Sequence, residues 1–199
     1  MAIANERLGG VYKADGKMKE ALVCYTEYQQ ISKYLSDLNP ANIEYKINLA
    51  IANERLGDVY KTEQKPEETF TSYKAFHDIR RSLWESNPQN AEYTNELAVS
   101  CERLGDVYKE KGEMEEALKY YNEEFNGFES LFKSDPGNVE YQNCLAVAHS
   151  KLGEMFENEE KKSHHTEAKK IWEELVIKVP GNTMYQNNLD WVNEQLNKI

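Results

Sequence analysis

Apolar residues recur three and four positions apart through most of the chain, with charged and amide side chains between them. Ala52, Leu56, Val59 and Tyr60 show the pattern, which places apolar side chains on one side of an α-helix. Prolines interrupt it at regular intervals, and a proline disfavours a helical conformation in the residue before it. We therefore predict an all-α chain with nine helices at about residues 2–13, 17–38, 42–62, 66–86, 90–110, 113–133, 138–157, 164–179 and 183–198.

The pattern repeats with an offset of 48 residues. The octapeptide AIANERLG stands at 2–9 and again at 50–57, and related octapeptides stand at 98–105 (AVSCERLG) and 146–153 (AVAHSKLG). A Pro-x-Asn segment precedes each later copy, and its asparagine is placed to cap the helix that follows. Each period therefore predicts two antiparallel helices joined by a tight turn.

The repeated residues resemble the tetratricopeptide repeat, a helix–turn–helix unit of about 34 residues with the pattern L-G-x2-Y, then A-x3-F/Y, then proline. Leu104, Gly105, Tyr108, Ala117 and Tyr121 follow this pattern closely. The resemblance covers nearly the whole chain and implies a right-handed superhelical solenoid of helical hairpins in a single domain over 1–199. The expected units are about 1–39, 40–87, 88–135 and 136–179, with a C-terminal capping helix over 182–199.

The period is longer than the family's because both helices of a unit are longer. Ala21 to Pro40 and Ala117 to Pro136 each span 19 positions, seven more than in an ordinary unit. Seven residues are close to two helical turns, so the apolar stripe extends without rotating away from its neighbour. Around Ala168 the spacing to proline is short again, which predicts a shortened last unit whose longer turn carries the charged run 159–162.

The repeated spacing also predicts which residues lie in the core. Leu8, Leu56, Leu104 and Leu152 are predicted core residues. The glycines that follow them lie in mid-helix, where glycine costs about 1 kcal/mol relative to alanine. A close contact with the partner helix is expected to explain them. Phosphate binding is the alternative, and it is not supported because no glycines cluster after a strand.

The charge and cysteine content narrow the classes of partner. The chain carries 35 Asp and Glu against 24 Lys and Arg, a net charge of −11, which disfavours contact with a nucleic-acid backbone. Apolar stretches of a few residues are far short of the roughly 20 that a membrane helix needs, and no signal peptide is visible. Three scattered cysteines, Cys24, Cys101 and Cys144, favour a reducing compartment. We expect a cytoplasmic protein with neither nucleic acid nor membrane as a partner.

The beginning of the chain has two interpretations. Met1 stands where Leu49, Leu97 and Leu145 stand in later repeats, so the first helix lacks its leading turns. This helix is either naturally short or cut from a longer array, and the second interpretation is favoured.

No residue pattern indicates catalysis, a metal or a cofactor. His149 occupies the position of Asn53 and Cys101 and is expected to be packed, and the pair His164 and His165 has no Cys or carboxylate partners at ligand spacing. The acidic pair at 123–124 is expected to be solvated surface, because adjacent side chains on a helix point apart. No enzyme is predicted.

The surface expected to carry function is the row of first helices, which in this family lines the concave groove. The candidate partner-binding residues are Arg7, Ile51, Arg55, Asp58, Val99, Arg103, Asp106, Val147 and Lys151. In one interpretation the basic residues form a ladder prepared for a partner's carboxylates. In the other, Arg55 and Asp58 and their equivalents form exposed pairs within one helix, each worth a few tenths of a kcal/mol.

The function implied by the resemblance is a protein-interaction scaffold or a sensor module that binds a protein or peptide segment in the groove, without catalysis. The alternative is a structural solenoid that self-associates into homo-oligomers through its exposed end repeats. The stripe of Ile3, Leu8 and Val11 would then be the contact, since it has no upstream neighbour.

Overall fold

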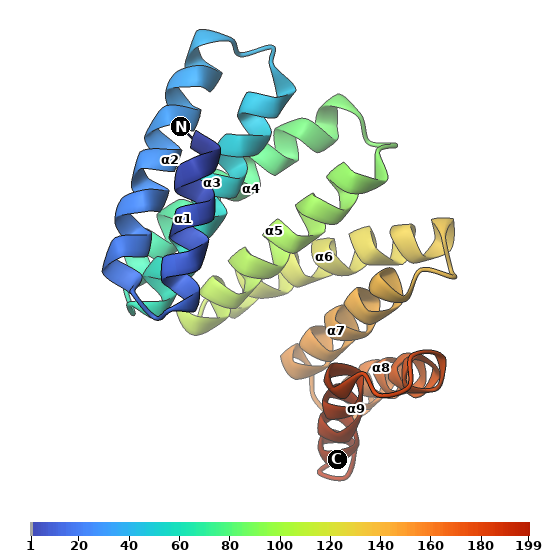
Figure 1. Cartoon of the computed structure of the whole chain (residues 1–199). Coiled ribbons are helices and arrows are strands. Elements are labelled where there is room, and N and C mark those ends of the chain that lie inside the picture. The colour runs from blue at the N-terminus through green and yellow to red at the C-terminus, as the bar shows by residue number, and fades with distance from the viewer. Residues whose placement is uncertain (1) are drawn as a thin grey trace. The chain divides into compact units, whose positions relative to one another are not determined.

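The computed structural model describes residues 2–199, and every regular element within that range is an α-helix (Figure 1). The helices are α1 (Ala2–Ala14), α2 (Met18–Leu38), α3 (Ile43–Thr62), α4 (Pro66–Ser86), α5 (Ala91–Glu110), α6 (Met114–Ser134), α7 (Val139–Met155), α8 (Asn158–Lys178) and α9 (Thr183–Leu196). Eight of these agree with the predicted ranges to within two residues at each end, and the all-α class is confirmed. Met1, the basis of the two interpretations of the chain's beginning, lies outside the described residues.

The chain divides into two compact units, one ending at Tyr93 and the other beginning at Thr94. In the first unit, α1, α2, α3 and α4 each pack against the next helix in sequence, and in the second α6, α7, α8 and α9 do the same. Within each unit, consecutive helices run in opposite directions, as the hairpins of Figure 1 show. Each unit has its own core, with Tyr25 and Leu56 in the first and Phe128 and Leu145 in the second.

The asparagine of each Pro-x-Asn segment caps the helix that follows it. Its side-chain oxygen accepts a hydrogen bond from the backbone N–H three residues later, at 3.2 to 3.4 Å. The four capping residues are Asn42, Asn90, Asn138 and Asn182. The caps confirm the predicted helix starts and satisfy N–H groups that have no partner within the helix.

A glycine of the first helix lies against an aromatic ring of the second helix in each of the first three hairpins. The pairs are Gly9 with Tyr25, Gly57 with Tyr73, and Gly105 with Tyr121. A Cβ atom at any of these glycines would lie less than 3.0 Å from the tyrosine ring. A methyl group there would force the ring and its helix away, so the predicted close contact is confirmed and outweighs the low helix propensity of glycine.

The last hairpin differs from the prediction. Helix α8 begins at Asn158, so the charged run 159–162 is helical, and the expected long turn and shortened last helix are wrong. Helix α8 has 21 residues, as many as α2, α4 and α6. The shortening falls on α7, which has 17 residues where α3 and α5 have 20.

This shortening changes which residue faces the repeated glycine. A Cβ at Gly153 would lie 2.7 Å from the ring of His165, so His165 takes the place of the tyrosine. Glycine and ring are 16 positions apart in the earlier hairpins and 12 apart here, a loss of about one helical turn. Trp172 therefore aligns with Phe128, because each is the fifteenth residue of its helix. The segment from Ala168 to Trp172 matches the A-x3-F/Y spacing of the family motif, but it lies two turns further along its helix than Ala117 and Tyr121 do on α6.

Not every predicted core leucine is buried. Leu56, Leu104 and Leu152 are at most 4% exposed, whereas Leu8 is 44% exposed. Ala21 and Tyr25 of the preceding hairpin's second helix pack against Leu56. Within residues 2–199 no helix precedes α1, so Leu8 has no equivalent cover and its predicted burial is wrong.

Two adjacent glycines of α1 allow a test of the glycine–ring contact. We expect Gly9→Ala to lower the free energy of unfolding, because its methyl group would meet the Tyr25 ring at 2.6 Å. We expect Gly10→Ala to raise it by up to about 1 kcal/mol, because the nearest atom is 3.9 Å away and alanine favours the helix. Urea unfolding followed by circular dichroism measures both. Equal shifts in the two variants would contradict this explanation.

Candidate functional site

Ion pairs join the first helices of neighbouring hairpins in the unit that ends at Tyr93. Lys13 of α1 lies 2.8 Å from the carboxylate of Asp58 on α3, and Arg55 of α3 lies 3.7 Å from Glu6 on α1. The hydroxyl of Tyr73 also donates to Asp58, at 2.8 Å. These pairs run between repeats, whereas the prediction placed the pairing of Arg55 with Asp58 inside one helix.

The same arrangement recurs between α5 and α7 in the second unit. The Lys151 ammonium lies 2.9 Å from Glu102 and 2.7 Å from Asp106, and Lys109 pairs with Glu154. The hydroxyl of Tyr121 donates to Asp106 at 2.9 Å. In both units a lysine four positions after a repeated glycine meets the acidic residue one position after the next glycine.

Lys151 is the most enclosed of these cations, with 19% of its side chain exposed. Burial alone would lower the pKa of Lys151, but the nearby carboxylates of Glu102 and Asp106 outweigh burial and raise it above its ordinary value. Its ammonium group also lies 5.4 Å from the centre of the Tyr121 ring. Lys151 therefore stays charged, and its charge is already balanced within the protein.

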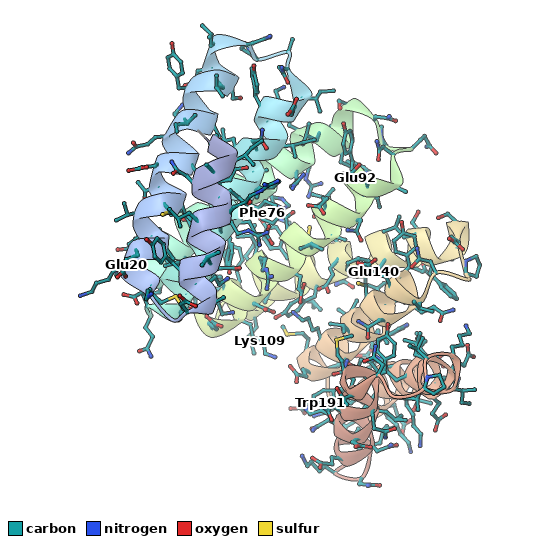
Figure 2. The ribbon with its side chains drawn as sticks, viewed as in Figure 1. Glu20, Phe76, Glu92, Lys109, Glu140 and Trp191 are labelled. Carbon is teal, nitrogen blue, oxygen red and sulfur yellow. The ribbon has the colours of Figure 1, made fainter. Side chains whose placement is uncertain are left out.

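Two pockets open on either side of Lys151 and Glu154. The first holds about 470 Å³, and its walls are Asp106, Lys109, Glu110, Tyr121, Lys151 and Glu154. The second holds about 230 Å³, and its walls are Val147, Ser150, Lys151, Glu154, Trp172, Asn188 and Trp191. Because the two pockets share Lys151 and Glu154, they form one continuous surface over α5, α7 and α9, which we call the α5–α7–α9 face. Figure 2 labels Lys109 and Trp191, which lie on the two outer helices of this face.

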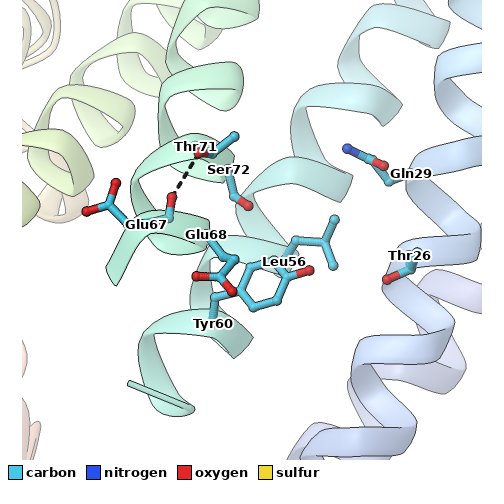
Figure 3. A pocket seen from close by; sticks show the side chains of 8 residues that line it. All are labelled: Thr26, Gln29, Leu56, Tyr60, Glu67, Glu68, Thr71 and Ser72. Atoms are coloured by element: carbon cyan, nitrogen blue, oxygen red, sulfur yellow. Dashed lines mark hydrogen bonds between the residues drawn. The ribbon is translucent and has the colours of Figure 1, made fainter. Parts of the chain in front are cut away.

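A third pocket, of about 330 Å³, lies in the first unit between α2, α3 and α4 (Figure 3). Thr26 and Gln29 of α2 stand across from Leu56 and Tyr60 of α3, and the first two turns of α4 form the remaining wall. No predicted site residue lines this pocket. Its one aromatic ring, that of Tyr60, is half-buried, and the pocket lacks the balanced charges of the α5–α7–α9 face.

Glu124 of α6 is a buried acid. Its side chain is 1% exposed, and neither carboxyl oxygen has a hydrogen-bond partner. Burial raises the pKa of Glu124 well above its ordinary value, Lys151 opposes this rise, and Glu102 and Asp106 add to it. The expectation of a solvated acidic pair at 123–124 is therefore wrong for Glu124.

The repeat itself carried the signal that was missed. The positions one and two periods before Glu124 are Phe76 and Tyr28, both buried. A residue aligned with two core aromatics is expected in the core whatever its charge, so alignment by period would have located this acid.

Two histidines pack together near the end of α7. Nδ1 of His149 lies 3.0 Å from Nδ1 of His164 on α8, and the rings contact Phe125 and Phe156. Burial, and then the neighbouring His164, lowers the pKa of His149 to about 4. Burial also lowers the pKa of His164. Both rings are therefore neutral at pH 7, with one Nδ1–H donating to the other, and the predicted packed role of His149 is confirmed.

The structure brings together some of the predicted site residues and not others. Asp106, Val147 and Lys151 line the α5–α7–α9 face. Arg55 and Asp58 take part in the ion pairs between α1 and α3. The remaining predicted residues line none of the three pockets: Arg7 is exposed, whereas Ile51, Val99 and Arg103 are half-buried.

Sequence reasoning missed the aromatic residues of the face. Tyr121 and Trp172 were placed in the family motif as core residues, and both also border a pocket. Trp191 stands six positions after Tyr185, where Ile51, Val99 and Val147 stand six positions after their tyrosines. Alignment of the last helix on its capping asparagine would therefore have added Trp191 to the predicted row.

Two further kinds of site have no support among residues 2–199. No three side chains of His, Cys, Asp or Glu gather as a metal site would need. None of the described helices combines the length and the apolar character required to cross a membrane.

Comparison with known proteins assigns the repeat. Residues 98–123 match the family model of the tetratricopeptide repeat. This segment contains the L-G-x2-Y motif that recurs every 48 residues. The chain therefore contains a tetratricopeptide-type repeat. Proteins built from such repeats generally bind other proteins and are usually not catalytic. A search of curated proteins finds no significant match.

Solved structures support the same fold. The chain is similar to BtubC (BKLC) from P. vanneervenii, with a TM-score of 0.68 and 16% identity, covering 96% of this chain and 70% of that one. It is also similar to a putative kinesin light chain from Podosopora anserina with nearly identical TPR-like repeats. There the TM-score is 0.57 and the identity 15%, covering 98% of this chain and 88% of that one. At these identities the similarity establishes an α-solenoid fold.

The buried acid gives a prediction about stability and pH. In the unfolded chain a glutamate ionises at about pH 4.3. In the folded protein Glu124 keeps its proton to higher pH, so stability falls as pH rises above that value. Glu124→Gln cannot ionise, so we expect its advantage over the native protein to grow as pH rises from 4 towards neutrality. Urea unfolding at a series of pH values measures this difference, and a difference that stays constant with pH would contradict the buried neutral acid.

Proposed function

We propose that the chain is a non-catalytic protein-interaction scaffold, and that the α5–α7–α9 face holds a segment of its partner. The observation that carries this proposal is the pair of joined pockets around Lys151 and Glu154. The face offers aromatic and aliphatic surface at Trp191 and Val147 next to charged groups. Apolar anchors beside polar groups are the usual composition of a recognition surface.

The ion pairs of this face are suited to exchange with a partner. The side chains of Lys109 and Glu154 are 34% and 39% exposed, and exposed pairs contribute only about 0–1 kcal/mol, so opening this pair costs little free energy. Rigid hairpins hold the groups in place, because Tyr121 is fixed between Gly105 and Asp106. The face is thus preorganised while its charges remain available, which limits the entropy lost on binding.

Selection from a displayed library of short random peptides tests this proposal. We expect the native protein to enrich peptides that lose binding to a Val147→Arg variant, because the arginine would fill the smaller pocket. The control is Ile177→Arg, since Ile177 is 78% exposed on α8 and lines neither pocket. Peptides that bind both variants as well as the native protein would reject the face as the binding site.

A second candidate function is self-association through α1. Ile3, Leu8 and Val11 are 55%, 44% and 57% exposed and form an apolar stripe on one helix. Residues 2–9 are identical to residues 50–57 on α3, where the same stripe is covered by the preceding hairpin. We propose that two copies cover this stripe by packing their α1 helices together about a two-fold axis.

Sedimentation velocity over a range of concentrations tests the self-association. We expect a monomer–dimer equilibrium in the native protein that Leu8→Lys abolishes, because a lysine would be buried at the two-fold contact. Val23→Lys is the matched control, since Val23 is 59% exposed on α2 and lies outside the stripe. A native protein that stays monomeric at every concentration would rule out this function.

A further inference from the structure

Two histidine rings join α7 to α8 near the turn of their hairpin. The Nδ1 atoms of His149 on α7 and His164 on α8 lie 3.0 Å apart. The ring of Phe156 stacks on His164 with 5.7 Å between the ring centres, and the ring of Phe125 from α6 meets His149 edge-on at 4.8 Å. Phe156 and Glu157 form the whole connection between the two helices, so Phe156 ties the histidine pair to the turn.

The fold does not require histidine at this place. In the first unit, the residues two periods before His149 and Phe125 are Asn53 and Gln29. The Gln29 amide donates to Oδ1 of Asn53 at 3.1 Å, and the Asn53 amide donates to the carbonyl of Leu49 at 2.8 Å. Neither amide gains or loses a proton at ordinary pH. The first unit therefore makes the equivalent contact with a neutral pair, whereas the second unit uses rings that titrate.

The contact between the two rings depends on how many protons they carry. At neutral pH one Nδ1–H donates to the lone pair of the other Nδ1. A first added proton can bind the distal Nε2 of the donor ring and leave this hydrogen bond in place, although it introduces a charge into a half-buried site. A second proton must bind the accepting Nδ1, which removes its lone pair and brings two cations together. Full protonation of the pair therefore breaks the contact.

We propose that the His149–His164 pair is an acid-sensitive latch, which holds the start of α8 against the end of α7 at neutral pH and releases it when the pair is protonated. This inference concerns the hairpin and does not rest on the proposed function of the α5–α7–α9 face. Release uncovers the rings of Phe125 and Phe156 that the histidines now contact. Histidine suits such a device because its charge changes close to neutral pH.

Two carboxylates act on His149 from the helices packed beside it. Glu129 of α6 and Glu167 of α8 each favour its protonated form. They are already paired with Lys133 at 2.8 Å and Lys170 at 2.6 Å, which weakens their effect. Burial and then the neighbouring histidine outweigh these carboxylates and lower the pKa of His149 to about 4.

The next two histidines along the chain respond in the same direction. Burial lowers the pKa of His164 against the effect of Glu160. Burial and then Lys161 lower the pKa of His165 against the effect of Glu154. In an opened hairpin a histidine titrates near about 6.5, so protons bind the open form preferentially as pH falls. The stabilisation from the closed pair is thus complete above about pH 6.5 and is lost as pH falls towards about 4.

Hydrogen exchange of the full chain measures the release. With a pKa of about 4 in the closed hairpin and about 6.5 in the open one, His149 alone raises the opening constant about twentyfold between pH 7 and pH 5. We expect the protection factors of amides 162–167 in α8, corrected for the intrinsic exchange rate, to fall by about this factor. Amides 24–28 of α2, in the other unit, should keep their protection and so exclude a general effect of acid.

A double variant transfers the neutral pair of the first unit to the second. We expect Phe125→Gln/His149→Asn to reduce the fall in protection to less than about threefold, because the amide pair does not titrate. The matched control is His165→Tyr, which restores the tyrosine that faces the repeated glycine in the earlier hairpins. This variant removes a neighbouring histidine and leaves the latch in place, so the twentyfold fall should persist.

Nuclear magnetic resonance of the imidazole nitrogens gives a second measurement that needs no variant. At pH 7 we expect the proton of one ring of the pair on Nδ1 and that of the other on Nε2. Two rings both protonated on Nε2 would overturn the latch, as would an equal fall in protection in α2 and α8 or a fall that persists in the double variant. A fall that disappears in His165→Tyr would assign the response to His165 and reject the pair.

Discussion

The close contact between a glycine of one helix and a ring of the next is the constraint on which the other features depend. Without a Cβ at Gly105, the ring of Tyr121 lies directly on the backbone of α5, and its hydroxyl reaches Asp106. Asp106 in turn holds Lys151 of the next hairpin. One contact therefore fixes the pairing inside a hairpin and places the charges that join it to its neighbour.

The fold could be predicted from the sequence because the determining signals are local and repeat. The octapeptide, the capping asparagines and the prolines recur together every 48 residues and locate eight of the helices. The last hairpin was mispredicted because two signals compete there. The motif from Ala168 to Trp172 matches the family, whereas the ring contact to Gly153 belongs to His165. Steric contact decided the register, and no local motif reports the length of α7.

The candidate site was less predictable, because charge pairing between repeats depends on which helices become neighbours. The sequence contains Lys109 and Glu154 but does not indicate that these residues, 45 positions apart, form an ion pair. It does show that Glu124 stands one period after Phe76. The burial of Glu124 could therefore have been predicted by aligning the repeats, whereas its charge alone suggested a surface position.

The most direct test of the glycine–ring account is a nuclear Overhauser spectrum of the full chain that resolves the α-protons of Gly153. The account predicts cross-peaks from these protons to the ring of His165, and upfield shifts of the corresponding protons of Gly105 under the Tyr121 ring. Cross-peaks from Gly153 to the indole of Trp172 would contradict it, because α8 would then sit two turns away from the register described here.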